Sequence, residues 1–166
     1  MASHACALLL LACASAWPGW IAAATSQSFQ VSATITAGCL VVGGVSNYGS
    51  LAFGSQSALS TSTVRVALTG GVQLQCTPGV TLNMTVDGGQ YNSSGRHMQL
   101  DSGSARVAYQ LFRDAGYSQS LGIGQSVAVA YSDANNISLP IYGQVQLPGN
   151  QPGGTYSDVL QVQLSW

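Results

Sequence analysis

The sequence has 166 residues, and only 5% of them are Asp, Glu, Lys or Arg, against about 25% in a typical soluble domain. It contains no Lys and no Glu, while 53 residues are Ser, Thr, Gln or Asn. Nucleic-acid binding needs clustered basic side chains, which four dispersed Arg residues do not supply. Because 46% of the residues are hydrophobic, we expect a packed core rather than disorder. Five Asp and two His leave little material for acid–base catalysis, so we expect no enzyme activity, no cofactor and no metal site.

The first 24 residues have the pattern of a secretory signal peptide. An apolar run over residues 5–16 is followed by small residues that end at Ala24, where we predict cleavage. A transmembrane anchor needs about 20 apolar residues, and Pro18 interrupts the run too early. Lipoprotein processing at Cys13 is a third interpretation. The pattern predicts export of the mature chain.

Cleavage at this position leaves two cysteines, Cys39 and Cys76. Exported chains meet an oxidising compartment, where two cysteines are expected to form one disulfide. A metal site would need more ligands, and His97 alone does not complete one. The sequence therefore predicts a Cys39–Cys76 disulfide.

Alternation of apolar and polar residues recurs along the mature chain and predicts β-strands. It begins with Phe29, Val31, Ala33 and Ile35, which share one face. Further strands are predicted over residues 72–76, 80–86, 107–112, 127–131, 137–147 and 156–166. Asp87-Gly88-Gly89 supplies a turn after the strand predicted over residues 80–86. Pro140 indicates an edge position or a bulge in the strand predicted over residues 137–147.

About seven short strands separated by turn residues predict a single antiparallel β-sandwich of immunoglobulin-like type over residues 38–166. In its last strand, one face carries Leu160, Val162, Leu164 and Trp166. Because the sequence stops there, we expect this strand to be an exposed edge. Residues 25–37 precede the disulfide as an uncharged arm. The arm has the pattern needed for strand addition to another molecule, and equally that of an ordinary first strand.

The mature chain resembles the spore coat protein U domain family, which contains secreted pilin subunits of the archaic chaperone-usher pathway of Gram-negative bacteria. The resemblance depends on the order and spacing of several short motifs. These motifs are Phe29-Gln-Val31-Ser-Ala33-Thr-Ile35, Leu51-Ala-Phe53-Gly54, Val72-Gln-Leu74-Gln-Cys76, Val86-Asp87-Gly88-Gly89, Arg96-His-Met98, Tyr109-Gln-Leu111-Phe112-Arg113-Asp114, Tyr142-Gly143, Gly154-Thr-Tyr156-Ser-Asp158 and the terminal Trp166.

The resemblance implies an immunoglobulin-like sandwich that lacks its last strand and has an open groove beside the C-terminal strand. A periplasmic chaperone would lend a strand to this groove, and at an outer-membrane usher the arm of the next pilin subunit would replace it. Carried onto this sequence, the donor residues are Phe29, Val31, Ala33 and Ile35. The acceptor residues are Leu160, Val162, Leu164 and Trp166.

The function implied by the resemblance is that of a structural subunit of a surface pilus, secreted through the periplasm and serving adhesion and biofilm formation. Two alternatives stay open. A tip adhesin would carry an added receptor-binding domain in place of the arm. A self-complemented secreted coat protein would fold its arm into its own groove.

Overall fold

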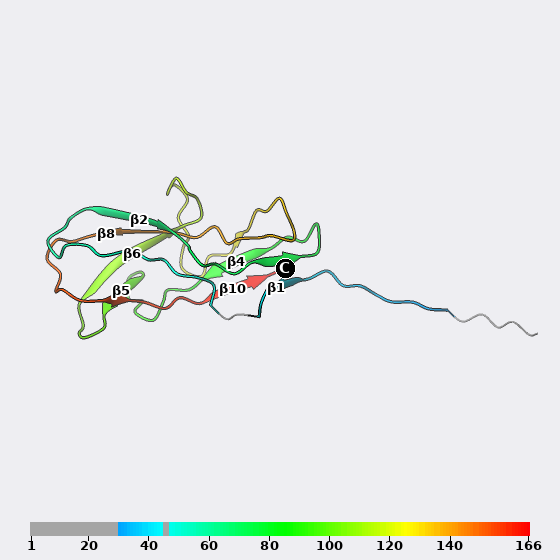
Figure 1. Cartoon of the computed structure of the whole chain (residues 1–166), viewed down its shortest axis with the longest axis horizontal. Coiled ribbons are helices and arrows are strands. Elements are labelled where there is room, and N and C mark those ends of the chain that lie inside the picture. Colours follow the sequence, from blue (N-terminus) through cyan, green and yellow to red (C-terminus); the bar gives the residue numbers. More distant parts are fainter. Residues whose placement is uncertain (1–29, 45–46) are drawn as a thin grey trace, which may run out of the picture. The chain divides into compact units, whose positions relative to one another are not determined.

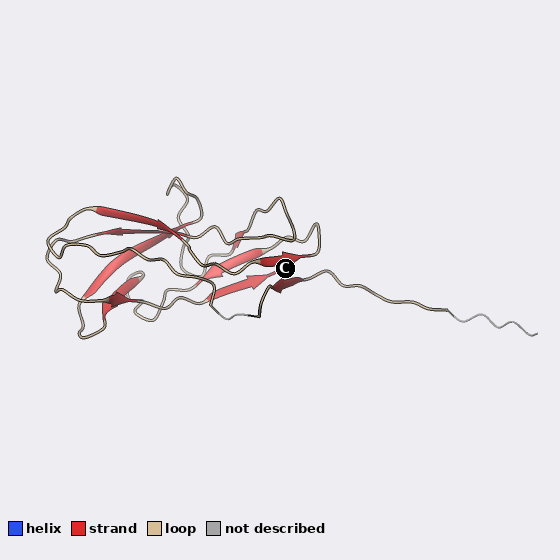
Figure 2. Cartoon of the chain, in the orientation of Figure 1, coloured by secondary structure: helices blue, strands red, loops and turns tan. Residues whose placement is uncertain are grey.

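The computed structural model describes residues 30–44 and 47–166. The predicted signal peptide and Phe29 lie outside the described residues. The chain divides into two units, residues 1–34 and residues 35–166, and every strand in the described ranges belongs to the second. Figure 2 shows these strands joined by loops, and none of the described residues forms a helix long and apolar enough to cross a membrane.

The strands of residues 35–166 form three antiparallel sheets (Figure 1). The largest has the order β2-β8-β6-β5-β9, with β2 at Thr63–Ala67, β8 at Tyr142–Gln146, β6 at Arg106–Phe112, β5 at His97–Leu100 and β9 at Tyr156–Ser157. The second has the order β10-β4-β7, with β10 at Val162–Ser165, β4 at Asn83–Val86 and β7 at Val127–Ala128. The third pairs β1 (Cys39–Val41) with β3 (Leu74–Cys76).

One hydrophobic core joins these sheets, because alternate residues of each strand point into it. Exposed and buried positions alternate along β6, so Val107, Tyr109 and Leu111 lie in the hydrophobic core. Met84 and Val86 of β4 are fully buried in the same cluster. The predicted antiparallel β-sandwich is therefore confirmed.

Most of the predicted strands are shorter in the structure than their alternation suggests, and two of them show a physical reason. Pro140 lies between an isolated bridge at Ile137 and the start of β8. Proline has no N–H to donate to the ladder, so the strand predicted over residues 137–147 is interrupted there. The strand predicted over residues 156–166 is divided between two sheets, since β9 pairs with β5 and β10 pairs with β4. Residues 158–161 cross from one sheet to the other.

The turn predicted at Asp87-Gly88-Gly89 follows β4. Gly89 has a φ of 80°, a left-handed conformation that glycine adopts without strain. The Asp87 carboxylate accepts a hydrogen bond of 3.0 Å from the Gly89 N–H. The turn therefore has the Asx geometry that this sequence favours.

Candidate functional site

Strand β10 is an edge of its sheet. Its register with β4 places Val162 opposite Val86 and Leu164 opposite Met84, and β4 is its one strand neighbour within residues 47–166. Leu160, Val162 and Leu164 are half-buried and pack against the core. The other edge of β10 thus presents backbone groups that an added strand can pair with.

A long groove lies beside this edge. Its first part has a volume of about 580 Å³ and is lined by residues 47–51, Phe53 and residues 156–162 among others. Its second part, of about 510 Å³, is lined by residues 51–58, 147–149 and 151–156 among others. The two parts share Leu51, Phe53, Met98 and Tyr156, so they adjoin each other, and we treat them together as the long groove.

The floor of the long groove is the surface of the hydrophobic core. Val86 and Ile141 line the first part, and Val107 and Val145 line the second; all four are buried. Among the described residues of the lining, Asp158 is the one that carries a charge. An apolar strand placed in the groove would extend the core without meeting an unpaired charge.

The four predicted acceptor residues differ in position. Leu160 and Val162 line the groove, whereas Leu164 packs against the core outside the lining. Trp166 is 60% exposed, and its indole nitrogen lies beside Gly38. Sequence reasoning missed the opposite wall, which includes Leu51 and Phe53. Their alternation is visible in the sequence, but nothing in it places that segment across from residues 156–162.

The predicted donor residues that the structure describes are uncovered. Val31 is 80% exposed and Ile35 is 92% exposed, and Ala33 is also exposed. Residues 30–38 form no strand. The expected alternation is present, but these side chains are not buried against a sheet.

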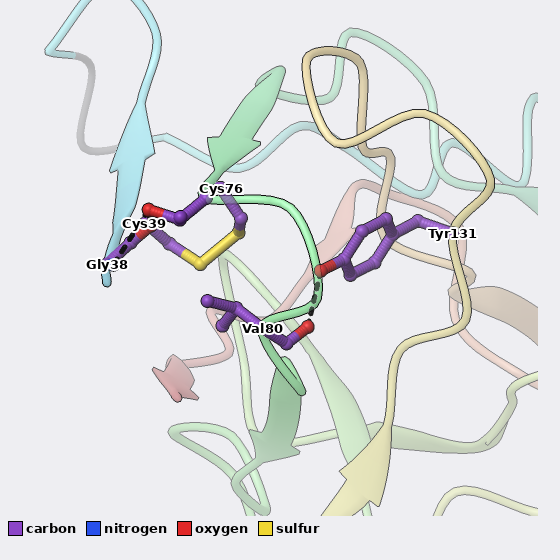
Figure 3. The surroundings of a disulfide bond; sticks show 6 residues. Gly38, Cys39, Cys76, Val80 and Tyr131 are labelled. Carbon is purple, nitrogen blue, oxygen red and sulfur yellow. Dashed lines mark hydrogen bonds between the residues drawn. A yellow bond between two sulfur atoms is a disulfide. The ribbon is translucent and has the colours of Figure 1, made fainter. Parts of the chain in front are cut away.

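The disulfide Cys39–Cys76 is present and joins β1 to β3 (Figure 3). The two cysteines face each other in the strand register, and Cys76 is buried. The Gly38 carbonyl accepts a hydrogen bond of 2.9 Å from the Thr77 N–H, and nearby the Tyr131 hydroxyl donates to the Val80 carbonyl. The disulfide and the Gly38–Thr77 hydrogen bond tie residue 38 and strand β1 to β3 and the residue that follows it.

A polar network lies at the wall of the groove where residues 158–161 cross between the sheets. The buried Arg96 side chain donates to the carbonyls of Leu121 and Val86 at 2.7 and 3.0 Å, and burial lowers its pKa. The Tyr109 hydroxyl donates to the Asp158 carboxylate at 2.6 Å. Burial and this hydrogen bond raise the pKa of Tyr109 well above its ordinary range. Tyr109 is therefore held as a neutral donor, which suits a structural anchor at the groove.

No group of three His, Cys, Asp or Glu side chains that could hold a metal ion occurs within the part of the chain that the structure describes. His97 is half-buried on β5, and its Nδ1 lies 2.8 Å from the Gly95 carbonyl oxygen. This contact ties the His97 ring to the local backbone.

Comparison with protein-family models matches residues 25–163 to the Spore Coat Protein U domain. The chain belongs to the Spore Coat Protein U domain family. The match covers the arm, the disulfide, the groove lining and the first half of β10. The resemblance inferred from the sequence motifs is thereby confirmed.

Solved structures of similar fold include subunit complexes of chaperone-usher pili. One is the CsuC–CsuE chaperone–tip adhesion subunit pre-assembly complex from archaic Csu pili of Acinetobacter baumannii, with 14% identity and a TM-score of 0.50. It covers 80% of this chain, and this chain covers 41% of that one. Another is a chaperone–tip adhesin complex of CFA/I fimbriae, with 12% identity and a TM-score of 0.44, over 78% of this chain and 41% of that chain. A search of curated proteins finds no match.

Proposed function

We propose that this protein is a structural subunit of a surface pilus that assembles through donor-strand exchange. The observation that carries the proposal is the long groove beside the open edge of β10, with an apolar floor and a single charged residue in its described lining. Membership of the Spore Coat Protein U domain family supports it. So does the similarity in fold to a pilus subunit complex of A. baumannii.

The proposed occupant of the groove in the fibre is the arm of a neighbouring subunit, residues 25–37. Its apolar positions Phe29, Val31, Ala33 and Ile35 alternate as the side chains of an added strand do. Burial of each large side chain contributes about 1.5 to 3 kcal/mol, and the ladder hydrogen bonds to β10 add to this. The first charged side chain of the sequence is that of Arg65, so the arm brings no charged side chain into the groove.

The proposal includes a route to the surface. Residues 1–24 act as the signal peptide, and residues 38–166 form the pilin domain. In the periplasm a chaperone strand covers the groove, and at an outer-membrane usher the arm of the next subunit takes its place. The finished fibre lies on the cell surface and serves adhesion and biofilm formation, and the subunit itself catalyses no reaction.

Deletion of residues 25–36 tests the proposal in the organism that carries the gene. We expect the full chain to give a ladder on unboiled denaturing gels that collapses to one band on heating, because noncovalent strand exchange holds the subunits together. The deletion variant retains its groove but has no arm to donate, so we expect no ladder on unboiled gels. A ladder from the deletion variant would overturn the donor role of the arm.

The same gels distinguish the alternatives. A full chain that runs as a monomer, with an arm protected from proteolysis, would favour a self-complemented coat protein over a polymer. A full chain found once per fibre and confined to its end would favour a tip subunit. Uniform labelling along the fibre by an antibody to this chain supports the proposed shaft role.

A further inference from the structure

The alternation of apolar residues in β10 does not determine its register. Register is usually set by the hydrophobic pattern and by turn geometry. Here the pattern has apolar residues at positions 160, 162, 164 and 166, so a shift by two residues leaves the same kind of side chain facing the core. No tight turn joins β10 to β4, because the two strands lie far apart in the sequence.

The competing register would place Leu164, instead of Val162, opposite Val86. This shift adds two residues to the segment that crosses from β9 to β10, which makes it slack rather than strained. It would also replace the side chains that line the groove. The register observed therefore needs a cause at the crossing segment, residues 158–161.

Asp87 supplies the first contact. Its N–H donates to the Gln161 carbonyl at 3.1 Å, and its carboxylate accepts from the Gln161 N–H at 2.9 Å. The Asp87 carbonyl, which would ordinarily accept a ladder bond, instead accepts from Arg96 Nε at 2.8 Å. The carboxylate thus takes the place of the carbonyl at the end of the β4–β10 ladder and holds the backbone of residue 161 there.

Asp158 supplies the second contact, three residues earlier. Its Oδ1 accepts from the Gln90 N–H at 2.9 Å, and its Oδ2 accepts from the Tyr109 hydroxyl at 2.6 Å. The carboxylate rests on Gly89, where a Cβ atom would come within 2.0 Å of it. Both donors belong to the turn after β4 or to β6, so they hold the start of the crossing segment to the core.

We propose that Asp87 and Asp158 are positioning residues that set the register of β10 and so determine which side chains line the long groove. We call the pair the register clamp. It holds the two ends of a four-residue segment, which leaves no slack for a shift of two residues. The consequence for donor-strand binding rests on the proposed function, whereas the register itself does not.

Engineered cysteine pairs report the register in the secreted full chain. Thr85 lies opposite Gln163 in the observed register, so Thr85→Cys with Gln163→Cys is expected to form a disulfide. In the shifted register Thr85 would face Ser165, so Thr85→Cys with Ser165→Cys reports the shift. Each pair is quantified by mass spectrometry after proteolysis, with the Cys39–Cys76 disulfide retained.

We expect Asp87→Ala and Asp158→Ala each to raise the shifted cross-link about tenfold or more, in line with the loss of hydrogen bonds to a charged group. Asp87→Asn keeps an oxygen for the Gln161 N–H and is expected to retain the observed register. Tyr131→Phe removes a hydroxyl that bonds elsewhere, to Val80, and controls for a general loss of stability. Should either alanine variant fail to fold, Tyr109→Phe removes one donor to Asp158 and is expected to give a smaller shift in the same direction.

An equal, low yield of the shifted cross-link in the wild-type background and in the folded clamp variants would overturn the clamp. The gel assay adds a separate result, because a shifted groove is expected to weaken the ladder. If the wild-type chain forms no ladder, the proposed function fails while the cross-link result still decides the register clamp.

Discussion

At the scale of single residues, the most informative side chain is Tyr109. Burial and the hydrogen bond to Asp158 raise its pKa, so the fold favours the neutral hydroxyl. The unfolded chain ionises this group near pH 10. The stabilisation is therefore complete below about pH 10 and decreases as the pH rises above it.

The raised pKa of Tyr109 predicts that the folded chain loses stability at alkaline pH. We expect the free energy of unfolding of the wild-type chain, measured with urea, to fall between pH 9 and pH 11. In Tyr109→Phe the decrease is expected to be smaller, although the variant is less stable at pH 8. Tyr131→Phe is the control and is expected to keep the wild-type decrease, since Tyr109 is still present. A decrease of equal slope in Tyr109→Phe would contradict the argument.

Gly89 offers a second test at this scale. Its φ of 80° disfavours any side chain, and a Cβ there would collide with Asp158. Gly79 has nearly the same φ, 83°, but has open space around the Cβ position. The two positions therefore separate backbone strain from loss of the Asp158 contact.

We expect Gly79→Ala to lower the free energy of unfolding by about 1 kcal/mol, from the left-handed conformation alone. Gly89→Ala is expected to cost about 2 to 4 kcal/mol, because displacing Asp158 also leaves polar groups unsatisfied. Chemical denaturation of both variants measures the difference. Equal losses would show that the Asp158 contact adds nothing to stability.

At the scale of elements, β10 combines a half-buried face with an open edge. Val162 faces the groove and Gln163 points to solvent. Thr has nearly the shape of Val but adds a hydroxyl, which is costly to bury without a partner. The groove face is thus expected to be sensitive to a substitution that the outer face tolerates.

We expect Val162→Thr to lower the temperature at which the ladder dissociates on denaturing gels, because the hydroxyl is buried once a donor strand binds. Gln163→Thr places the same residue on the outer face and is expected to leave that temperature unchanged. The unfolding midpoint of the unassembled chain is measured alongside. A shift in both variants alike would argue against a groove-specific effect.

Alternation identified most elements of the fold because it reports one buried face directly. The strand predicted over residues 107–112 is β6 at Arg106–Phe112, where every second side chain is buried. Alternation does not report where a strand changes sheets. Residues 156–166 alternate almost without a break, yet the crossing at Asp158 divides them because its carboxylate bonds to Tyr109 and Gln90.

Only one wall of the groove could be predicted, because alternation within a segment does not report which other segment lies beside it. Alternation predicted that Leu160 and Val162 share a face, and both line the groove. Leu51 and Phe53 line the other wall, about a hundred residues earlier in the sequence. Pairing over such distances depends on the whole sheet order. In the arm, alternation predicts an apolar face but does not predict which molecule covers that face.

At the scale of the whole molecule, the low charge of the sequence is explained by the arm and the groove, which can be buried against each other without burying unpaired charges. No charged residue precedes Arg65, and the described groove lining includes one charge, Asp158, which is hydrogen-bonded to Tyr109 and Gln90. Arm and groove are therefore both suited to mutual burial. Outside them, Ser, Thr, Gln and Asn provide polar surface without charges that would need partners.

This complementarity predicts a sharp difference between two neighbouring positions of the arm. Val31 shares the apolar face with Ile35, and Ser32 lies on the opposite face. In a docked strand the first would point into the groove and the second to solvent. A carboxylate at position 31 would lose its hydration without gaining a partner, which costs several kcal/mol.

We therefore expect Val31→Asp to abolish the heat-sensitive ladder, whereas Ser32→Asp leaves it largely intact although it adds the same charge to the same arm. Both variants are expected to keep the wild-type unfolding midpoint of the pilin domain, because residues 31 and 32 are exposed in the unassembled chain. Unboiled gels and thermal unfolding measure the two effects separately. Equal ladders from the two variants would mean that this face of the arm is not buried in the assembled fibre, and loss of both ladders would mean that the arm tolerates no charge on either face.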